Sequence, residues 1–364
     1  MRPIKVFGGE SPGGLQLPPA KASRSNLYGP RGVTIYGDDL IVCDTGNHRV
    51  LIFKDFLDSD RIEADAVIGQ SDFDSEHHSS PNSESGLYMP TQASVIDRYL
   101  VVADSWHHRV VAFEYSSKEG PSRRAIWTIG QKDLDSVEAN QGYDTPSGSS
   151  LYWPFGFALI GDTFFVADTG NRRVLVWPKP PIPVLEPADE VMGQDNIFQR
   201  EENRGALAGD TFRWPHTVDG DKDLVFVADA GNHRVLGFNH TKLTEPAQVV
   251  VGQDSPFENS EWPYGPQGPT RLRFPYGLSV DQGRLAIADT ANNRVLIYKN
   301  LPSGYGVAAD YVLGQVDFEQ NGENLWKSIT PETLCWPYGV DMVGDLLAVA
   351  DTGNNRVVIW KVEV

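Results

Sequence analysis

DTGNHRV, residues 44–50, decides the fold, because close variants of it return at regular intervals along the chain. Successive copies start about 60 to 64 residues apart, a period typical of repeat architectures. The later copies are DSWHHRV at Asp104, DTGNRRV at Asp168, DAGNHRV at Asp229, DTANNRV at Asp289 and DTGNNRV at Asp351. Six repeats of this length occupy the chain, so we expect a single domain over residues 1–364.

Each heptapeptide lies between two short apolar runs, LIVC and VLIF at the first copy, which predicts two strands joined by a tight turn. A third strand precedes them and opens at a proline, as in WPFGFALIG at residues 153–161. A fourth follows and ends in Gly-Gln, as in AVIGQ at residues 66–70. Each repeat therefore predicts a four-stranded antiparallel sheet.

The strands are nearly continuous apolar runs, which indicates sheets covered on both faces, as in the radially stacked blades of a propeller. The fold class predicted is all-β, a six-bladed β-propeller of four-stranded antiparallel blades. The sixth repeat has only three strands, whereas IKVFGG at residues 4–9 resembles a fourth-strand pattern. We expect this N-terminal strand to join the last blade and close the ring.

The pattern D-[TAS]-x-N-x-R-V after an apolar strand, with P-x-G opening the repeat, resembles the NHL repeat. GQSDF at residues 69–73 and GQVDF at residues 314–318 look like elements of bacterial NHL proteins. The resemblance spans essentially the whole chain and implies the propeller. Roles in the family range from RNA binding and protein binding to an amidating lyase, so the resemblance does not select a function.

Acidic residues outnumber basic ones, 49 to 31, and the formal net charge is −18, which argues against nucleic acid as a partner. No apolar run approaches a membrane span, and the start, MRPIKVFGGE, lacks signal-peptide features. We therefore expect a monomeric, cytoplasmic protein without membrane attachment. Cys43 and Cys335 are too far apart for metal-like spacing, and Cys43 takes the place of a buried alanine in the other repeats.

The Asp and Arg of each signature, such as Asp44 and Arg49, are predicted to pair across the hairpin. A pair that recurs in every blade indicates framework, because catalysis needs its residues only once. The turn asparagine, such as Asn47, is expected to bond to nearby backbone.

Antiparallel order puts the turn between the second and third strands on the same face as the crossover to the next blade. Crossovers of about 20 residues are typical of functional loops, so we expect the working face there. Residues flanking the repeated proline should surround the mouth of the central channel. The ligand-binding candidates are Arg31, Phe155, His216, Tyr276 and Tyr338 after the proline, and Trp153, Trp214 and Trp336 before it.

For the tryptophans before the proline, wedging between blades is the simpler structural interpretation. Residues after it vary in chemistry from blade to blade, and Arg31 and His216 are the pair most expected to contact a ligand. A metal is the other candidate, because blade two departs from the pattern and gathers histidines, which are common ligands of zinc or copper. The metal candidates are His77, His78, His107 and His108.

Two functions stay open at this stage. One is a binding scaffold that presents its crossover face to a protein partner or a small-molecule ligand. The alternative is an enzyme, a metal-assisted lyase or hydrolase that uses a divalent metal at the channel mouth. The amidating lyase of the NHL family lines its channel with histidines around a metal, whereas here only His216 has a mouth position.

Overall fold

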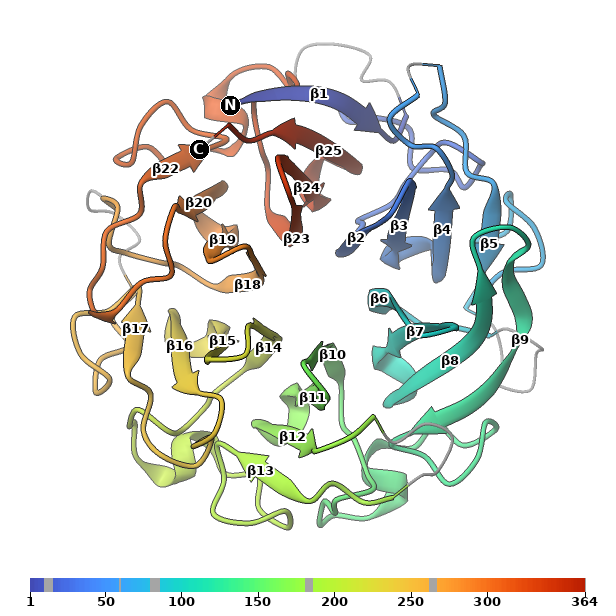
Figure 1. The fold of residues 1–364 in the computed structure, drawn as a ribbon. Coiled ribbons are helices and arrows are strands. Elements are labelled where there is room, and N and C mark those ends of the chain that lie inside the picture. The colour runs from blue at the N-terminus through green and yellow to red at the C-terminus, as the bar shows by residue number, and fades with distance from the viewer. Residues whose placement is uncertain (10–15, 59, 79–85, 181–185, 262–266, 364) are drawn as a thin grey trace.

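The computed structural model describes residues 1–9, 16–58, 60–78, 86–180, 186–261 and 267–363. Six sheets surround a central axis like the blades of a propeller (Figure 1). The first strand of each blade lies nearest this axis and the fourth lies at the rim. The predicted six-bladed, all-β architecture is therefore confirmed.

The first three blades follow the order of the chain from inner to outer strand. Blade 1 consists of β2 (Gly32–Tyr36), β3 (Asp39–Asp44), β4 (Arg49–Phe53) and β5 (Ala66–Ile68). Blade 2 consists of β6 (Pro90–Ile96), β7 (Tyr99–Asp104), β8 (Arg109–Ser116) and β9 (Gly120–Ile129). Blade 3 consists of β10 (Pro154–Ile160), β11 (Thr163–Asp168), β12 (Arg173–Trp177) and β13 (Glu190–Met192).

The remaining blades repeat the plan with two variations. Blade 4 consists of β14 (Pro215–Gly220), β15 (Leu224–Asp229), β16 (Arg234–Asn239) and β17 (Val249–Val251), with β21 (Gly304–Tyr305) added in parallel at its edge. Blade 5 consists of β18 (Pro275–Asp281), β19 (Arg284–Asp289), β20 (Arg294–Tyr298) and β22 (Tyr311–Leu313). Blade 6 consists of β23 (Pro337–Val343), β24 (Leu346–Asp351) and β25 (Arg356–Lys361), and its outer strand is β1 (Arg2–Phe7).

The helical segments of the described residues are 3-10 turns, and they fall into two groups. Those between the second and third strands of the blades are η1 (Thr45–Asn47), η2 (Ser105–His107), η4 (Thr169–Asn171), η6 (Ala230–Asn232), η7 (Thr290–Asn292) and η9 (Thr352–Asn354). Those in the crossovers are η3 (Ala139–Gly142), η5 (Glu202–Gly205) and η8 (Glu323–Trp326).

The N-terminal strand closes the ring as predicted. β1 pairs antiparallel with β25, so the two chain ends lie side by side in one blade (Figure 1). The strand begins and ends two residues earlier than the expected 4–9. Gly8 ends it because its φ is +120°, and a Cβ there would lie 2.7 Å from the carbonyl oxygen of Asn355.

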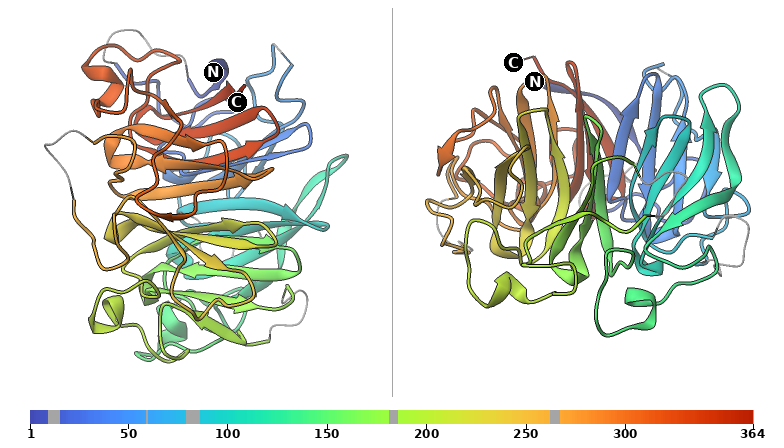
Figure 2. Two further views of the ribbon diagram at one scale, coloured as in Figure 1. Left: turned by 60° about the vertical axis from the view of Figure 1, so that its left-hand side comes forward. Right: turned by 60° about the horizontal axis from the view of Figure 1, so that its bottom comes forward.

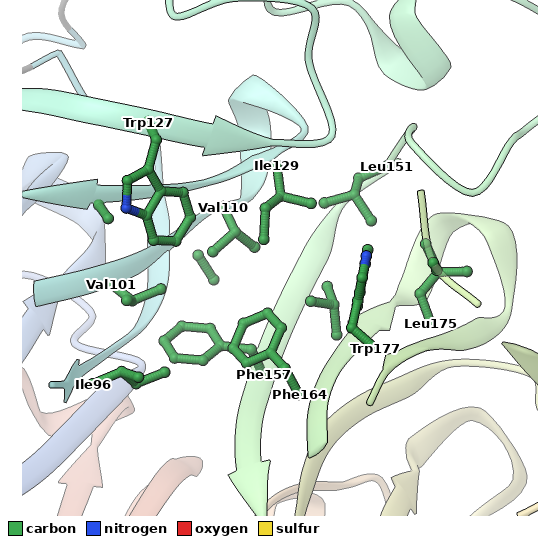
Figure 3. Packing of buried hydrophobic residues seen from close by; sticks show 14 of the residues in the cluster. Ile96, Val101, Val110, Trp127, Ile129, Leu151, Phe157, Phe164, Leu175 and Trp177 are labelled. Carbon is green, nitrogen blue, oxygen red and sulfur yellow. The ribbon is translucent and has the colours of Figure 1, made fainter. Parts of the chain in front are cut away.

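Apolar side chains fill each junction between neighbouring blades, which explains why both faces of each strand are hydrophobic. The blades stack face to face around the ring (Figure 2), and a separate buried cluster occupies each of the six junctions. Between blades 2 and 3, for example, Trp127 and Ile129 face Phe157, Phe164 and Trp177 (Figure 3). The core is thus six interfaces around an open axis, and the axis is left available for a site.

Candidate functional site

The signature residues form one buried network in every blade. In blade 3, Arg173 Nε lies 2.7 Å from Asp168 Oδ2, and neither side chain is exposed to solvent. Asn171 Nδ2 donates to the same carboxylate oxygen over 2.7 Å, and the other oxygen accepts the N–H of Tyr152. The asparagine was expected to bond to backbone; it donates to the Asp carboxylate instead, so this buried carboxylate accepts hydrogen bonds from Arg173, Asn171 and the N–H of Tyr152. Equivalent Asp–Arg pairs are 44–49, 104–109, 229–234, 289–294 and 351–356.

The arginine of each network also forms hydrogen bonds with the long crossovers. Arg173 donates to the carbonyl oxygens of Ser147 and Ser150 on the preceding crossover and of Ile197 on the following one. The glutamine of the Gly-Gln element acts in a similar way, because Gln70 Nε2 donates to the carbonyls of Asn47 and His77. These bonds hold crossovers and turns on one face of the ring, as the strand order predicts.

At five of the six junctions the residue before the signature arginine connects one blade to the next. His48 Nδ1 accepts the N–H of Met89 over 3.3 Å, and His108 Nδ1 accepts that of Trp153 over 3.2 Å. His233, Asn293 and Asn355 accept the corresponding N–H of the following blade. The residues so held have φ values of +50° to +54°, unusual for bulky side chains before proline. They are Gly29, Met89, Trp153, Phe274 and Trp336.

The junction between blades 3 and 4 is the exception. Arg172 takes the place of the His or Asn, and it donates to the carbonyls of Gly170 and Arg200 instead. Trp214, which follows on blade 4, does not have a positive φ. The positive φ therefore occurs at the five junctions where the acceptor side chain of the previous blade is present, and it is missing at the junction where Arg172 replaces that acceptor.

The structure does not bring the four metal candidates together. His107 stands where the other blades have the turn asparagine, and its Nδ1 lies 2.8 Å from Asp104 Oδ2. Nδ1 of His108 accepts the hydrogen bond from the N–H of Trp153. His78 stacks on Tyr88 with ring centroids 4.9 Å apart, and His77 is exposed. Over the parts of the chain that the structure describes, no three His, Cys, Asp or Glu side chains are grouped as metal ligands.

The central channel contains a cavity of about 310 Å3 that all six blades line. The residue that follows the repeated proline contributes in every blade, so the predicted Arg31, Phe155, His216, Tyr276 and Tyr338 come together here. The sixth member is Thr91. Arg31 N donates to Thr45 Oγ1 of the adjoining turn, which places this ring of six at the crossover end of the channel.

Four members of this ring form a row of aromatic contacts. Phe155 and His216 have ring centroids 4.5 Å apart, and His216 and Tyr276 are equally close. Tyr276 and Tyr338 stack at 4.4 Å with an interplanar angle of 12°. The Arg31 guanidinium continues the row, since its Cζ lies 4.8 Å from the centroid of Tyr338. This row and Thr91 together make up the collar, a ring of six residues in which the His and Tyr rings carry polar groups.

His216 has a defined protonation state within the collar. Its Nδ1 lies 3.0 Å from the carbonyl oxygen of Trp214, and a carbonyl only accepts, so Nδ1 carries the proton. Burial, and further the charge of Arg31, lower the pKa of His216 to about 4. At neutral pH the imidazole is therefore neutral, and Nε2 is a hydrogen-bond acceptor or a base.

A second ring of residues, five of them polar, lies deeper in the same cavity, three positions after the collar residue of each blade. Two of its members are acids, Asp219 and Asp341. Each bonds to the next blade: Asp219 Oδ2 accepts the N–H of Val280, and Asp341 Oδ2 accepts that of Ile35. Burial raises the pKa of Asp219 to about 7 and that of Asp341 to about 6. The cavity is thus cationic at its mouth and acidic deeper in.

The tryptophans before the proline do not line the cavity. Trp336 is 43% exposed and its Nε1 donates to Glu323 Oε1, and Trp214 is 36% exposed beneath the guanidinium of Arg213. Trp153 packs against Tyr152 and Trp106. They form an outer aromatic border on the crossover face, so any contact with a ligand would be made outside the channel.

Sequence reasoning missed several residues of the site. Trp106 lies against Phe155 at the collar, with centroids 5.9 Å apart, although it belongs to a turn. Gln92 of blade 2 stands where most blades have glycine, and its amide pairs with both the N–H and the carbonyl of Phe157. The deep acids could have been found by aligning the fourth residue after each proline, where they replace Thr, Ser or Ala.

Comparisons with known proteins agree with this architecture. The NHL repeat family model matches residues 27–53, which include the first signature. The chain therefore contains an NHL repeat and folds as a six-bladed β-propeller. No curated protein shows significant similarity to the chain.

Solved structures match at low identity. A protein of unknown function from Bacteroides thetaiotaomicron is 11% identical, with 100% of this chain and 76% of that one aligned at a TM-score of 0.55. The WD40 repeats of RRP9 are 10% identical over 98% of this chain and 82% of theirs, with a TM-score of 0.52. Kuenenia stuttgartiensis hydrazine synthase is 14% identical over 94% and 97%, with a TM-score of 0.51. These likenesses extend to the fold alone.

Proposed function

We propose that this propeller is a binding scaffold that holds a small ligand at the crossover end of its central channel. The observation that carries the proposal is the collar, in which one residue from every blade lines a cavity of about 310 Å3. Small-molecule sites are concave, mainly apolar, and contain a few convergent polar groups. His216 and the two tyrosines supply such groups from strands, and Arg31 supplies one from the position just before β2.

The experiment is a thermal-shift screen of the purified protein against a mixture of small metabolites. Hits should be lost in Arg31→Ala, His216→Ala and Tyr276→Ala proteins, and should persist in Lys242→Ala. Lys242 is the control because it follows β16 on the opposite face and is exposed, paired only with Glu245. Hits that survive all three collar substitutions would contradict the proposed site.

A protein partner is the second candidate, supported by exposed aromatic side chains on the crossovers. Phe257 is 70% exposed, Trp326 74% and Phe198 58%. Large exposed apolar residues are typical anchors of protein interfaces. Serine substitutions at these three positions should abolish capture of a protein partner and leave ligand binding in the channel unchanged.

The enzymatic alternative, a metal-assisted lyase or hydrolase, has its own test. Metal analysis of the purified protein would favour it if zinc, copper or another divalent ion were present at one equivalent. If blade 2 holds that metal, the double variant His107→Ala with His108→Ala should no longer contain it.

A further inference from the structure

Arg31 lacks the partner that buried arginines in this protein have. Each signature arginine pairs with its aspartate, whereas the Arg31 guanidinium lies over the Tyr338 ring, and no carboxylate of the described residues forms an ion pair with it. It is half-buried and lines the channel cavity. An arginine without a counter-ion that lines a cavity is suited to bind an anionic group.

The charge of Arg31 acts across the whole mouth. It is among the causes that lower the pKa of His216, three blades away in a ring of six, and it opposes the burial that raises the pKa of Tyr276. His216 therefore lies opposite Arg31, and its unprotonated Nε2 has no hydrogen-bond partner among the described residues. The mouth thus offers a cation on one side and an acceptor on the other.

The shape and charge of the cavity narrow the ligand further. Its volume of about 310 Å3 is at the small end of the range for ligand pockets, roughly 300–1,000 Å3. The apolar part of the collar is aromatic, which favours a planar ligand through stacked or edge-to-face contacts. Asp341 and the ionised fraction of Asp219 lie deeper in the cavity, and they disfavour a second negative charge on the ligand there.

We infer that the channel mouth binds a small planar monocarboxylate that also carries a hydrogen-bond donor, with the carboxylate on Arg31 and the donor on His216 Nε2. The inference rests on the proposed ligand-binding function and specifies its ligand class. Arg31 can form two parallel N–H···O bonds with a carboxylate, and neutral His216 accepts the O–H or N–H at the other end.

The test uses four probes of similar size with the full-length protein, measured by isothermal titration calorimetry. The probes are 4-hydroxybenzoate, benzoate, 4-hydroxybenzamide and 4-hydroxyphenyl phosphate. We expect 4-hydroxybenzoate to bind with a dissociation constant on the order of 1 mM or below, as a compound of about ten heavy atoms permits. Benzoate should bind about tenfold more weakly, and the neutral amide and the phosphate more weakly still.

Two substitutions assign the ends of the ligand. Arg31→Gln should weaken binding of 4-hydroxybenzoate about tenfold or more, whereas Arg31→Lys should retain part of it. His216→Phe keeps a ring between Phe155 and Tyr276 but removes the acceptor, so it should abolish the preference for 4-hydroxybenzoate over benzoate. Lys242→Ala should bind all probes as the unmodified protein does.

Three results would overturn the inference: no binding of either carboxylate at about 10 mM, the amide or the phosphate binding as well as 4-hydroxybenzoate, or Arg31→Gln binding unchanged. None of these results contradicts ligand binding at the collar if the metabolite screen still yields hits that depend on His216 and Tyr276. Loss of that dependence is the separate result that would contradict ligand binding at the collar. A melting temperature for each variant shows that a binding defect is not a folding defect.

Discussion

The signature network and the channel collar both receive residues from every blade. The network has the same ion pair in each blade, whereas the collar residue varies from blade to blade. The network keeps the same Asp and Arg in all six blades, buried and paired. The collar has Arg, Thr, Phe, His, Tyr and Tyr at six equivalent positions around one cavity. The six blades have equivalent turns that need the same ion pair. A ligand on the axis would contact each blade with a different part of its surface, so the six collar residues can differ.

Blade 2 shows the same contrast inside one turn. His107 replaces the network asparagine and still bonds to Asp104, so the framework role is retained with another residue. Trp106 replaces glycine in that turn and contacts Phe155 of the collar. Two departures from the repeat in one turn thus differ in role: His107 belongs to the framework, whereas Trp106 contacts the collar.

Removal of residues 1–9 should have the largest effect on the framework. It deletes the outer strand of blade 6, removes Phe7 from the core and exposes the edge of β25. We expect aggregation or a melting temperature lower by 10 °C or more, on the order of several kcal/mol of lost stability. Differential scanning calorimetry and light scattering measure both effects, and unchanged stability would mean that the ring does not need β1.

Arg173→Ala should be next in size. It leaves Asp168 buried without its partner and frees the carbonyls of Ser147, Ser150 and Ile197. Breaking a buried pair in this way costs about 3 to 5 kcal/mol. Urea unfolding measures the loss, and Lys242→Ala, which breaks an exposed pair, should cost less than about 1 kcal/mol. A stable Arg173→Ala protein that had lost ligand binding would reverse the assignment of framework and site.

The pH dependence of stability tests the deep acids. Because burial raises the pKa of Asp219 from 3.8 to about 7, the folded protein holds this proton more tightly than the unfolded chain. The contribution to stability is present below pH 3.8 and is lost as the pH rises through about 7. Asp219→Asn should therefore lose less stability than the unmodified protein between about pH 4 and pH 7. Parallel curves of unfolding free energy against pH would show that Asp219 titrates normally.

His107→Asn should have the smallest effect, because it restores the residue that the other blades use. The amide can donate to Asp104 as Asn171 does to Asp168. We expect a change in unfolding free energy within about 0.5 kcal/mol. A loss well above that value would assign His107 a role beyond the network.

Many residues of the site were predicted by aligning the repeats. The contacts that were not predicted share one physical reason. Arg31, His216 and the tyrosines were found because a residue at the same strand position in each blade must reach the same place on the axis. The partners of His108 and Gln92 were not found, because both lie on the next blade, 45 and 65 residues away in the chain. Such contacts depend on the angle between blades, which local patterns do not contain.

By itself the sequence determined the six blades, their strand order, the closure by the N-terminal strand and the pairing within each signature. The blades, their strand order and the pairing within each signature depend on periodicity and on contacts between strands that are close in the sequence. The closure joins the two ends of the chain, and it was predicted because the sixth repeat has only three strands. Only the tertiary structure decided that Trp153, Trp214 and Trp336 lie outside the channel, that His107 and His108 contact different partners, and that Arg31 faces His216 above two acids. The reason is that closing the ring brings distant side chains together at distances that no single repeat encodes.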